Sequence, residues 1–311
     1  MTQDSALKTI LITGGCGFIG TNLAEYLSGK GYRVRILDNL SSSSQVWTVN
    51  PPPTQQTAEL IIGDIRDKDM VNQALKGVDA VVHLAAHTSV VGSLENPEEN
   101  WDININGTLN LLEACRQNRA DKFIFASSNA AVGEQTPPID ERAIPRPLSP
   151  YGASKLAGEA LCSAYYHSFG LKTISLRFAN CYGPYSDHKS SVIARFMGWA
   201  REGKPLIIYG DGNQTRDFIH IVDVCQAIYL SLMTLDFYSE VFQIASGVET
   251  TINELAEMIE EVTGNKLQII HQMERKAEIR RNYADVSKAR AFLGFQPKVE
   301  LREGLKRLWN L

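Results

Sequence analysis

Three side chains in the middle of the chain could together move a proton: Ser128, Tyr151 and Lys155. A phenol with a pKa near ~10 is a poor base at neutral pH, but a nearby ammonium group favours the phenolate. Lowering the pKa of the phenol to ~7 requires about 4 kcal/mol of differential stabilisation. A serine hydroxyl bonded to the same substrate oxygen would complete the group. Such a group removes the proton of an alcohol while a hydride leaves the same carbon for a nicotinamide.

A Tyr-x-x-x-Lys pair alone is weak evidence, because the chain also contains Tyr26/Lys30 and Tyr185/Lys189. Only Tyr151/Lys155 begins a long predicted helix and follows a serine at the end of a predicted strand. The i, i+4 spacing puts both side chains on one helix face. Since open α/β sheets bind ligands outside the carboxyl ends of their strands, this pair is the one predicted to meet Ser128.

A glycine-rich segment, Thr13–Gly20, lies between the first predicted strand and the first predicted helix. Gly14, Gly17 and Gly20 allow a tight turn and a close backbone approach to a pyrophosphate at a helix N-terminus. Asp38 ends the second predicted strand, eighteen residues after Gly20, near the spacing at which a carboxylate meets a ribose diol. Such a carboxylate would repel a 2′-phosphate, so the pattern predicts NAD rather than NADP. The alternative is a glycine turn used only for packing.

Asp64 and Ile65 follow the third predicted strand and could hold an adenine ring. An ordinary solvated loop carboxylate explains Asp64 equally well from spacing alone.

Short apolar runs alternate with helix-length segments through the first half of the chain. The predicted strands are Lys8–Thr13, Arg33–Leu37, Glu59–Ile62, Asp79–Leu84, Lys122–Ala126 and Lys172–Leu176. The predicted helices are Phe18–Ser28, Lys68–Leu75, Trp101–Asn118 and Tyr151–Phe169. This alternation predicts an α/β fold with a doubly wound parallel sheet of the Rossmann type.

The alternation of predicted strands and helices becomes less regular after about Arg177, where glycine-rich turns mark loops. We expect a Rossmann domain from residues 1–178 and 222–245, and a smaller C-terminal substrate-binding lobe from residues 179–221 and 246–311. Within this lobe, Thr251 and Glu254 fit a capping box that opens a helix over Ile252–Val262. Lys266–His271 is a predicted strand and Leu301–Trp309 a predicted terminal helix.

The composition is that of a soluble globular protein: 311 residues, 44% hydrophobic and 21% charged, with a formal net charge of -4. This balance predicts neither a nucleic-acid partner nor an anionic membrane partner. The five cysteines contain no Cys-x-x-Cys pair, and no leader-like segment opens the chain, so we expect a cytoplasmic protein. His83 and His87 lack a neighbouring glutamate and straddle a strand end, so no metal site is predicted.

With these residues in place, the chain resembles the extended short-chain dehydrogenase/reductase family, in its NAD-dependent nucleotide-sugar epimerase/dehydratase branch. The matching segments run almost end to end: Thr13–Gly20, Asp38-Asn39, Gly63-Asp64, His83–Ala86, Asn106–Thr108, Ser127-Ser128 with Tyr151/Lys155, Arg177–Pro184, Gly210–Gly212, Arg216–Phe218 and Ala284-Asp285.

The resemblance implies roles for individual residues. NAD would be bound by Gly14, Gly17, Phe18, Ile19, Gly20, Asp38, Asn39, Asp64, Ile65, Leu84, Ala85, Ala86, Asn104, Tyr151 and Lys155. A UDP-sugar would be bound by Ser128, Tyr151, Asn180, Arg216, Arg275, Glu278 and Asn282. Ala277 stands where the family usually has glycine, so the match around Arg275 and Glu278 is looser. A homodimer formed through the helices Trp101–Asn118 and Tyr151–Phe169 is also implied.

The residues after Ser128 bear on the reaction. Where the resemblance places an Asp-Glu pair in 4,6-dehydratases and a Glu in decarboxylases, this chain has Asn129 and Ala130. A 4-epimerase needs no further acid or base, so we predict a UDP-sugar 4-epimerase acting on UDP-glucose, UDP-N-acetylglucosamine or both. The alternatives are a UDP-glucuronate 4-epimerase, a dehydratase, a decarboxylase, a 2-epimerase, and a non-catalytic NAD-binding regulator.

Asn282 falls, by resemblance, at a position where a bulky tyrosine closes the sugar pocket to N-acetyl groups. Asparagine is smaller and leaves room for an acetamido group. The alternative is that Asn282 merely ends a loop.

Overall fold

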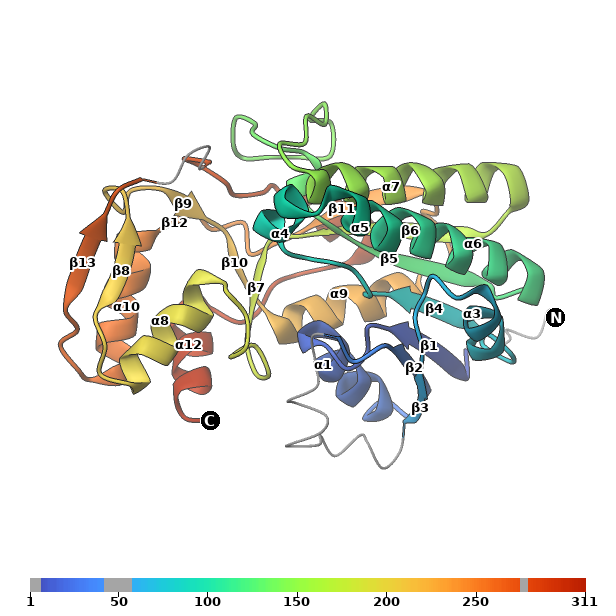
Figure 1. The fold of residues 1–311 in the computed structure, drawn as a ribbon, viewed down its shortest axis with the longest axis horizontal. Helices are drawn as coiled ribbons and strands as arrows, with labels where there is room; N and C mark the ends of the chain where they lie inside the picture. The colour runs from blue at the N-terminus through green and yellow to red at the C-terminus, as the bar shows by residue number, and fades with distance from the viewer. Residues whose placement is uncertain (1–6, 42–57, 275–278) are drawn as a thin grey trace. The chain divides into compact units, whose positions relative to one another are not determined.

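The computed structural model describes residues 7–41, 58–274 and 279–311. A seven-stranded sheet has the strand order β11-β6-β5-β4-β1-β2-β3 (Figure 1). Its strands are β1 (Thr9–Thr13), β2 (Arg33–Asp38), β3 (Glu59–Ile62), β4 (Ala80–His83), β5 (Lys122–Ser128), β6 (Lys172–Phe178) and β11 (Glu240–Ile244). The pairs β1–β2, β1–β4, β2–β3 and β4–β5 are parallel, and β1 and β4 are buried along their whole length. The predicted Rossmann-type α/β fold is confirmed.

Helices cover both faces of this sheet (Figure 1). On one face lie α3 (Lys68–Ala74), α6 (Gly107–Asn118) and α7 (Pro150–Phe169), with α6 between the other two. On the other face lie α1 (Phe18–Ser28) and α9 (Ile221–Met233). The sheet and the first set of helices share a core that includes Leu11, Val81, Leu111, Phe123 and Tyr165. The continuous apolar strands of the sequence are therefore the buried centre of three layers.

The prediction of one continuous helix over Trp101–Asn118 is wrong. The structure divides this region into α5 (Pro97–Trp101), a π-helical turn η2 (Asp102–Asn106) and α6. Asn96 caps α5 by accepting from Glu99 N at 3.3 Å, so the helical run starts earlier than the apolar pattern suggested. The π turn occurs where Asn104 turns its buried side chain into the core, and π turns of this kind are common at functional sites.

The chain forms two compact units. The first comprises Met1–Gly133, Ile144–Arg177 and Ala227–Phe242, and the second comprises Glu134–Ala143, Phe178–Gln226 and Gln243–Leu311. In the second unit, the helices α8 (Val192–Arg201), α10 (Ile252–Thr263) and α12 (Leu301–Trp309) share a core with the strand β8 (Leu206–Tyr209). This strand pairs in parallel with β13 (Ile269–Gln272). Two smaller pairs are β7 (Asn180–Tyr182) with β10 (Phe218–His220), and β9 (Thr215–Arg216) with β12 (Thr250–Thr251).

The capping box at the start of α10 is confirmed. Thr251 Oγ1 accepts from Glu254 N at 3.0 Å, and Glu254 Oε2 accepts from Thr251 N at 2.7 Å. Two of the N–H groups that every helix leaves unpaired at its start are thereby satisfied.

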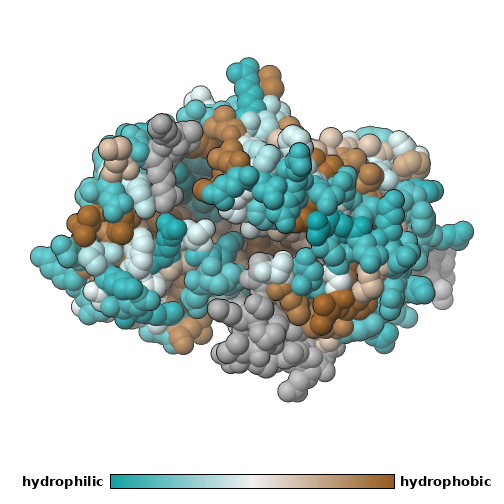
Figure 2. Space-filling model, viewed as in Figure 1, coloured by the Kyte–Doolittle hydropathy of each residue, from teal (hydrophilic) through white to brown (hydrophobic). Residues whose placement is uncertain are grey.

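The face of the molecule in Figure 2 is largely hydrophilic, with apolar residues in small separate groups. Among the helices of the described residues, none is long and apolar enough to cross a membrane.

Candidate active site

Glycines shape the turn between β1 and α1. Gly14 has a φ of +68°, and its N–H donates to Leu37 O at 2.9 Å. A Cβ on Gly14 would lie 2.6 Å from Ala85 N, and a Cβ on Gly20 would collide with the Gly14 carbonyl. Gly17 is the N-cap residue of α1 and offers no side-chain cap. The helix therefore opens with backbone N–H groups at a close backbone turn, which fits the pyrophosphate of a dinucleotide.

Asp38 is held beside this turn. Asp38 is buried, with a relative exposure of 8%. Its Oδ2 accepts from Cys16 N at 2.9 Å, and its Oδ1 accepts from Leu40 N at 2.8 Å. These two bonds fix the plane of the carboxylate at the carboxyl end of β2, where it fits the role of acceptor for a ribose diol. Burial, with the nearby Asp38 charge, raises the pKa of the Cys16 thiol, so this cysteine is an inert part of the turn.

Asn39 and Asp64 lie together at the same edge of the sheet. Asn39 Nδ2 donates to Asp64 Oδ2 at 3.2 Å, and Arg66 donates to both oxygens of Asp64, at 3.0 and 2.8 Å. The Arg66 hydrogen bonds lower the pKa of Asp64 to about 2. Ile65 is buried against Gly107, where a Cβ would have no room. The contact of Asp64 and Ile65 with adenine stays a prediction.

His83, at the end of β4, lies between two threonine hydroxyls. Thr108 Oγ1 donates to Asn104 O at 2.5 Å, so it must accept from His83 Nε2, 2.9 Å away. His83 Nδ1 then accepts from Thr13 Oγ1 at 2.7 Å. Burial, together with the charge of Lys155, holds the pKa of His83 well below its usual value. His83 is thus a neutral hydrogen-bonding residue of the core.

Asn104 links the π turn to the first turn of α7. Its Oδ1 accepts from His87 N at 2.8 Å, while its Nδ2 donates to His87 O at 3.1 Å and to Ser154 Oγ at 2.9 Å. Ser154 Oγ in turn donates to Tyr151 O at 2.8 Å. A predicted cofactor residue and a predicted catalytic residue are therefore joined through one buried serine.

Ser128 is the last residue of β5 and the N-cap of the short 3₁₀ helix η3 (Asn129–Ala131). Its Oγ accepts from Ala130 N at 3.2 Å. The first turn of α7 lies directly against η3, because a Cβ on Gly152 would collide with the Ala130 carbonyl. The segments that carry Ser128 and Tyr151 are therefore in contact, while the meeting of their side chains stays a prediction.

The start of α7 is fixed by two hydrogen bonds and by a proline at its first position. Ser149 is the N-cap, and its Oγ accepts from Gly152 N at 3.1 Å. Pro150 occupies the first helical position, where its missing N–H costs nothing. The next N–H, that of Tyr151, donates to Oγ of Ser93 in α4 (Val90–Glu95) at 3.2 Å. These contacts fix the backbone of Tyr151 at the carboxyl end of the sheet.

Lys155 lies one turn further along α7 and is buried. Its Nζ donates to Ala126 O at 2.9 Å, and it lies 5.1 Å from the centroid of the Phe125 ring and 5.9 Å from that of Tyr151. Burial lowers the pKa of Lys155 to about 8. The ammonium form therefore still predominates at neutral pH, and it favours the phenolate form of Tyr151.

A buried ion pair lies one further turn along α7, outside the residues that the sequence predicted to be functional. Glu159 receives Arg177 Nε at 2.8 Å and Arg177 Nη2 at 2.7 Å, and Ser127 Oγ donates to it at 2.5 Å. This pair connects α7, β5 and β6 directly behind Ser128 and Lys155. The i, i+4 spacing of Lys155 and Glu159 was the available signal.

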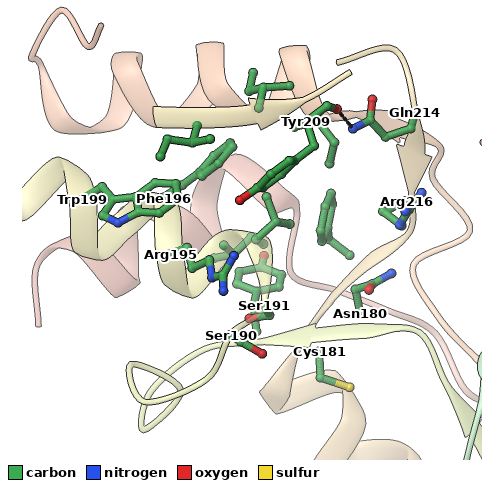
Figure 3. Close-up of a pocket in the computed structure, with 17 residues that line it drawn as sticks. Asn180, Cys181, Ser190, Ser191, Arg195, Phe196, Trp199, Tyr209, Gln214 and Arg216 are labelled. Atoms are coloured by element: carbon green, nitrogen blue, oxygen red, sulfur yellow. Dashed lines mark hydrogen bonds between the residues drawn. The ribbon is translucent and has the colours of Figure 1, made fainter. Parts of the chain in front are cut away.

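In the second unit, two predicted substrate residues, Asn180 and Arg216, line one cavity of about 200 Å³ (Figure 3). Arg216 Nη1 donates to Thr215 O at 2.7 Å and to Ile279 O at 2.8 Å, which orients its guanidinium. Asn180 donates to Asp217 O through both its N (3.0 Å) and its Nδ2 (3.1 Å). An amide and a fixed cation in one cavity suit an anionic ligand such as a diphosphate.

The cavity also contains residues that the sequence analysis did not name, among them Arg195, Phe196, Trp199, Tyr209 and Gln214. Gln214 Nε2 donates to Tyr209 O at 2.8 Å (Figure 3). These residues come from α8, β8 and the turn before β9, which carry no motif that would have marked them.

The other predicted substrate residues are placed differently. Arg275 and Glu278 lie outside the described residues. Asn282 N donates to Thr215 Oγ1 at 3.4 Å, and Asn282 is absent from the lining of the cavity. Its role toward the sugar stays a prediction.

The remaining predicted cofactor residues adjoin the glycine turn. Phe18 and Ile19 are the first two residues of α1, and Leu84, Ala85 and Ala86 directly follow β4. Ala85 N donates to Thr13 Oγ1 at 3.3 Å, which ties this segment to the end of β1. In the described part of the chain, no group of three or more His, Cys, Asp or Glu side chains could hold a metal ion.

The parallel sheet, with a glycine turn at its first crossover, defines a nucleotide-binding protein of the Rossmann class. Residues 10–245 match the model of the NAD dependent epimerase/dehydratase family. The chain belongs to this family, and its cofactor is NAD.

Individual relatives match over nearly the whole chain. A putative UDP-glucose 4-epimerase of Methanocaldococcus jannaschii is 41% identical over 97% of each chain. The crystal structure of a Thermotoga maritima UDP-glucose 4-epimerase with UDP-glucose has a TM-score of 0.91 at 36% identity, over 97% of each chain. A UDP-N-acetylglucosamine 4-epimerase of Methanobrevibacter ruminantium, in complex with UDP-N-acetylmuramic acid, has a TM-score of 0.91 at 35% identity, again over 97% of each chain.

Proposed function

We propose that this enzyme is a nucleotide-sugar 4-epimerase that acts on UDP-sugars. The observation that carries the proposal is the end of β5: Ser128, the start of α7 and Lys155 are held together by buried contacts. The segment after Ser128 holds Asn129, Ala130 and Ala131, none of which can serve as a second acid or base. Removal of water or of a carboxylate needs such a group, whereas inversion at C4 does not.

In this mechanism Tyr151 takes the proton of the sugar 4-hydroxyl, and Ser128 holds the same oxygen by a hydrogen bond. Lys155, with a pKa lowered to about 8, is still charged at neutral pH and stabilises the phenolate. The glycine turn after β1 and Asp38 would hold NAD, which would supply a hydride acceptor and donor for C4. Tyr151 gives the proton back to O4 once the ketone has presented its other face, so each group ends the cycle as it began.

The choice of a UDP-sugar is supported by the relatives described above, whose named substrates or ligands are UDP-glucose, UDP-N-acetylglucosamine and UDP-N-acetylmuramic acid. The cavity in the second unit supports it independently, because Asn180 and Arg216 offer hydrogen bonds and a positive charge to a diphosphate. In this proposal residues 1–178 and 222–245 hold the cofactor, and residues 179–221 and 246–311 hold the nucleotide sugar.

The test is to incubate the purified protein with UDP-glucose, UDP-N-acetylglucosamine or UDP-glucuronate, without added cofactor, and to separate the products by chromatography. The proposal expects the C4 epimer of UDP-glucose, of UDP-N-acetylglucosamine, or of both. A 4-keto-6-deoxy product would instead identify a dehydratase, and release of CO₂ a decarboxylase. Epimerisation of UDP-glucuronate alone would leave the reaction standing and change the sugar. Bound NAD with no turnover of any of the three would favour a regulator.

We further propose a cytoplasmic homodimer that forms through α6 and α7. Leu109 on α6 and Phe169 at the end of α7 are exposed apolar side chains, and none of the five cysteines forms a disulfide. Light scattering after size exclusion, under reducing conditions, should give twice the mass of 34.5 kDa. A monomer at micromolar concentration would rule out this assembly.

A further inference from the structure

Two guanidinium groups line the cavity of the second unit, and their surroundings differ. Arg216 is oriented by the carbonyls of Thr215 and Ile279. Arg195, on α8, lies on the opposite side of the cavity in Figure 3. Within the described residues, its guanidinium makes no hydrogen bond or ion pair. A partly buried guanidinium carries five N–H donors and no acceptor, so it suits a ligand that brings acceptors.

The cavity is aromatic at the Arg195 end. Phe196 and Trp199 lie on the same helix, with ring centroids 6.0 Å apart, and Tyr209 projects from β8 (Figure 3). Aromatic walls suit an uncharged planar ring, because they bury its faces. The fixed cation and the amide of Asn180 lie at the other end, where a diphosphate suits them. The cavity therefore has a base end and a phosphate end.

We propose that Arg195 reads the base of the nucleotide by donating to a carbonyl oxygen at C4 of a pyrimidine. Uracil and thymine have this acceptor, whereas cytosine has an amino group there, which is a donor. A cytosine would place donor against donor in a partly buried site and leave Arg195 unsatisfied. This inference rests on the proposed function, since it assigns the ligand of the cavity to the nucleotide part of the substrate. It makes Arg195 a specificity-determining residue for 4-keto pyrimidine nucleotides.

The experiment measures the affinity of the full-length protein for UDP and CDP by calorimetry, in the native sequence, in Arg195→Met and in Arg216→Met. The native protein should bind UDP at least about tenfold more tightly than CDP. Arg195→Met should lower the affinity for UDP by about tenfold and should not lower the affinity for CDP, because the opposed donors are then gone. Arg216→Met is the matched control, because the two ligands share the diphosphate. Arg216→Met should lower the affinities for UDP and for CDP by the same factor.

Retained CDP binding in Arg195→Met also shows that the site is still folded. The inference is overturned if the native protein binds UDP and CDP equally, if Arg195→Met weakens both ligands in parallel, or if it weakens neither. A parallel loss would place Arg195 on a phosphate or the ribose. These results leave the epimerase proposal standing, whereas a native protein that binds neither nucleotide overturns both proposals.

Discussion

The N–H of Tyr151 donates to the hydroxyl of Ser93 at 3.2 Å, across 58 residues of sequence. Ser93 is fully buried, and its own hydroxyl donates to Val90 O at 2.7 Å, which leaves its oxygen free to accept from Tyr151. The bond connects the start of α7 to α4, while Ser154 connects the carbonyl of the same residue to Asn104. Both backbone polar groups of Tyr151 are thus held by buried serine side chains. One of these serines lies on α4, and the other lies on α7 and is fixed in turn by Asn104.

Replacing Ser93 by alanine should remove this support. We expect the free energy of unfolding to fall by about 1 kcal/mol, the usual contribution of one hydrogen bond. Because the phenol would lose its fixed position, kcat should fall severalfold with little change in KM. Ser89→Ala is the control, since Ser89 is the N-cap of α4, where it accepts from Gly92 N at 2.9 Å, and it makes no hydrogen bond to Tyr151. Equal kinetic effects of the two variants would refute the positioning role of Ser93.

Tyr151→Phe removes the proton-transfer group itself. Turnover should fall by ~10²–10⁴, the usual weight of a positioned acid or base, while NAD stays bound and the melting temperature hardly changes. Tyr166→Phe, on the same helix, is the control and should keep full activity. Near-native turnover in Tyr151→Phe would show that another group moves the proton.

Asp38 should make the enzyme selective for NAD. The bonds from Cys16 and Leu40 hold its carboxylate at the end of β2, where a 2′-phosphate would meet a fixed negative charge. Asp38→Asn keeps an oxygen acceptor and removes the charge, so we expect NADP to bind at least about tenfold more tightly than to the native protein. Asp64→Asn is the matched control and should not change the NAD-to-NADP ratio in calorimetry. Equal native affinity for the two cofactors would exclude the diol role.

His83 should make the protein sensitive to mild acid. Its folded pKa lies well below the unfolded value of ~6.5, so the unfolded chain binds the proton more readily. The stability that neutral His83 contributes is therefore fully present above pH ~6.5 and is lost as pH falls below it, by up to about 1.4 kcal/mol per pH unit. His83→Gln should flatten the pH dependence of urea unfolding between pH 7.5 and 5.5. His220, whose pKa burial lowers to about 4, contributes the same sign and stays in both proteins, so their difference isolates His83. Parallel curves would contradict the assignment.

Much of the larger unit follows from local sequence. Its strands are continuous apolar runs bounded by turns, and the glycine turn and Asp38 have positions defined by spacing along the chain. The elements β7, β9, β10 and β12 are only two or three residues long, so they have no periodicity that could be recognised. The π turn at Asp102–Asn106 depends on bonds from Asn104 to His87 and Ser154, which only the folded chain brings together.

The candidate site likewise contains residues that the sequence predicts and residues that only the folded chain reveals. Ser128, Tyr151 and Lys155 are recognisable because a strand end and a helix start are visible in the sequence. Ser93 is not, because its partner lies far along the chain. Nor does the pattern at Arg195 separate a cavity-lining arginine from a solvated one, since both occur at the same helical spacing.

The last prediction concerns the sugar and Asn282. Its backbone N donates to Thr215 Oγ1, and the carbonyl of the next residue, Tyr283, accepts from Ile139 N at 3.0 Å, so the backbone here is anchored on both sides. A larger side chain at this position would therefore project from a fixed point. If this point borders the sugar, Asn282→Tyr should reduce kcat/KM for UDP-N-acetylglucosamine by at least about tenfold through steric clash and leave UDP-glucose nearly unchanged. Asn282→Ala is the control: it removes the amide without adding bulk and should keep activity on both sugars. Equal losses on both sugars in the tyrosine variant, or no loss on either, would place the wall of the sugar pocket elsewhere.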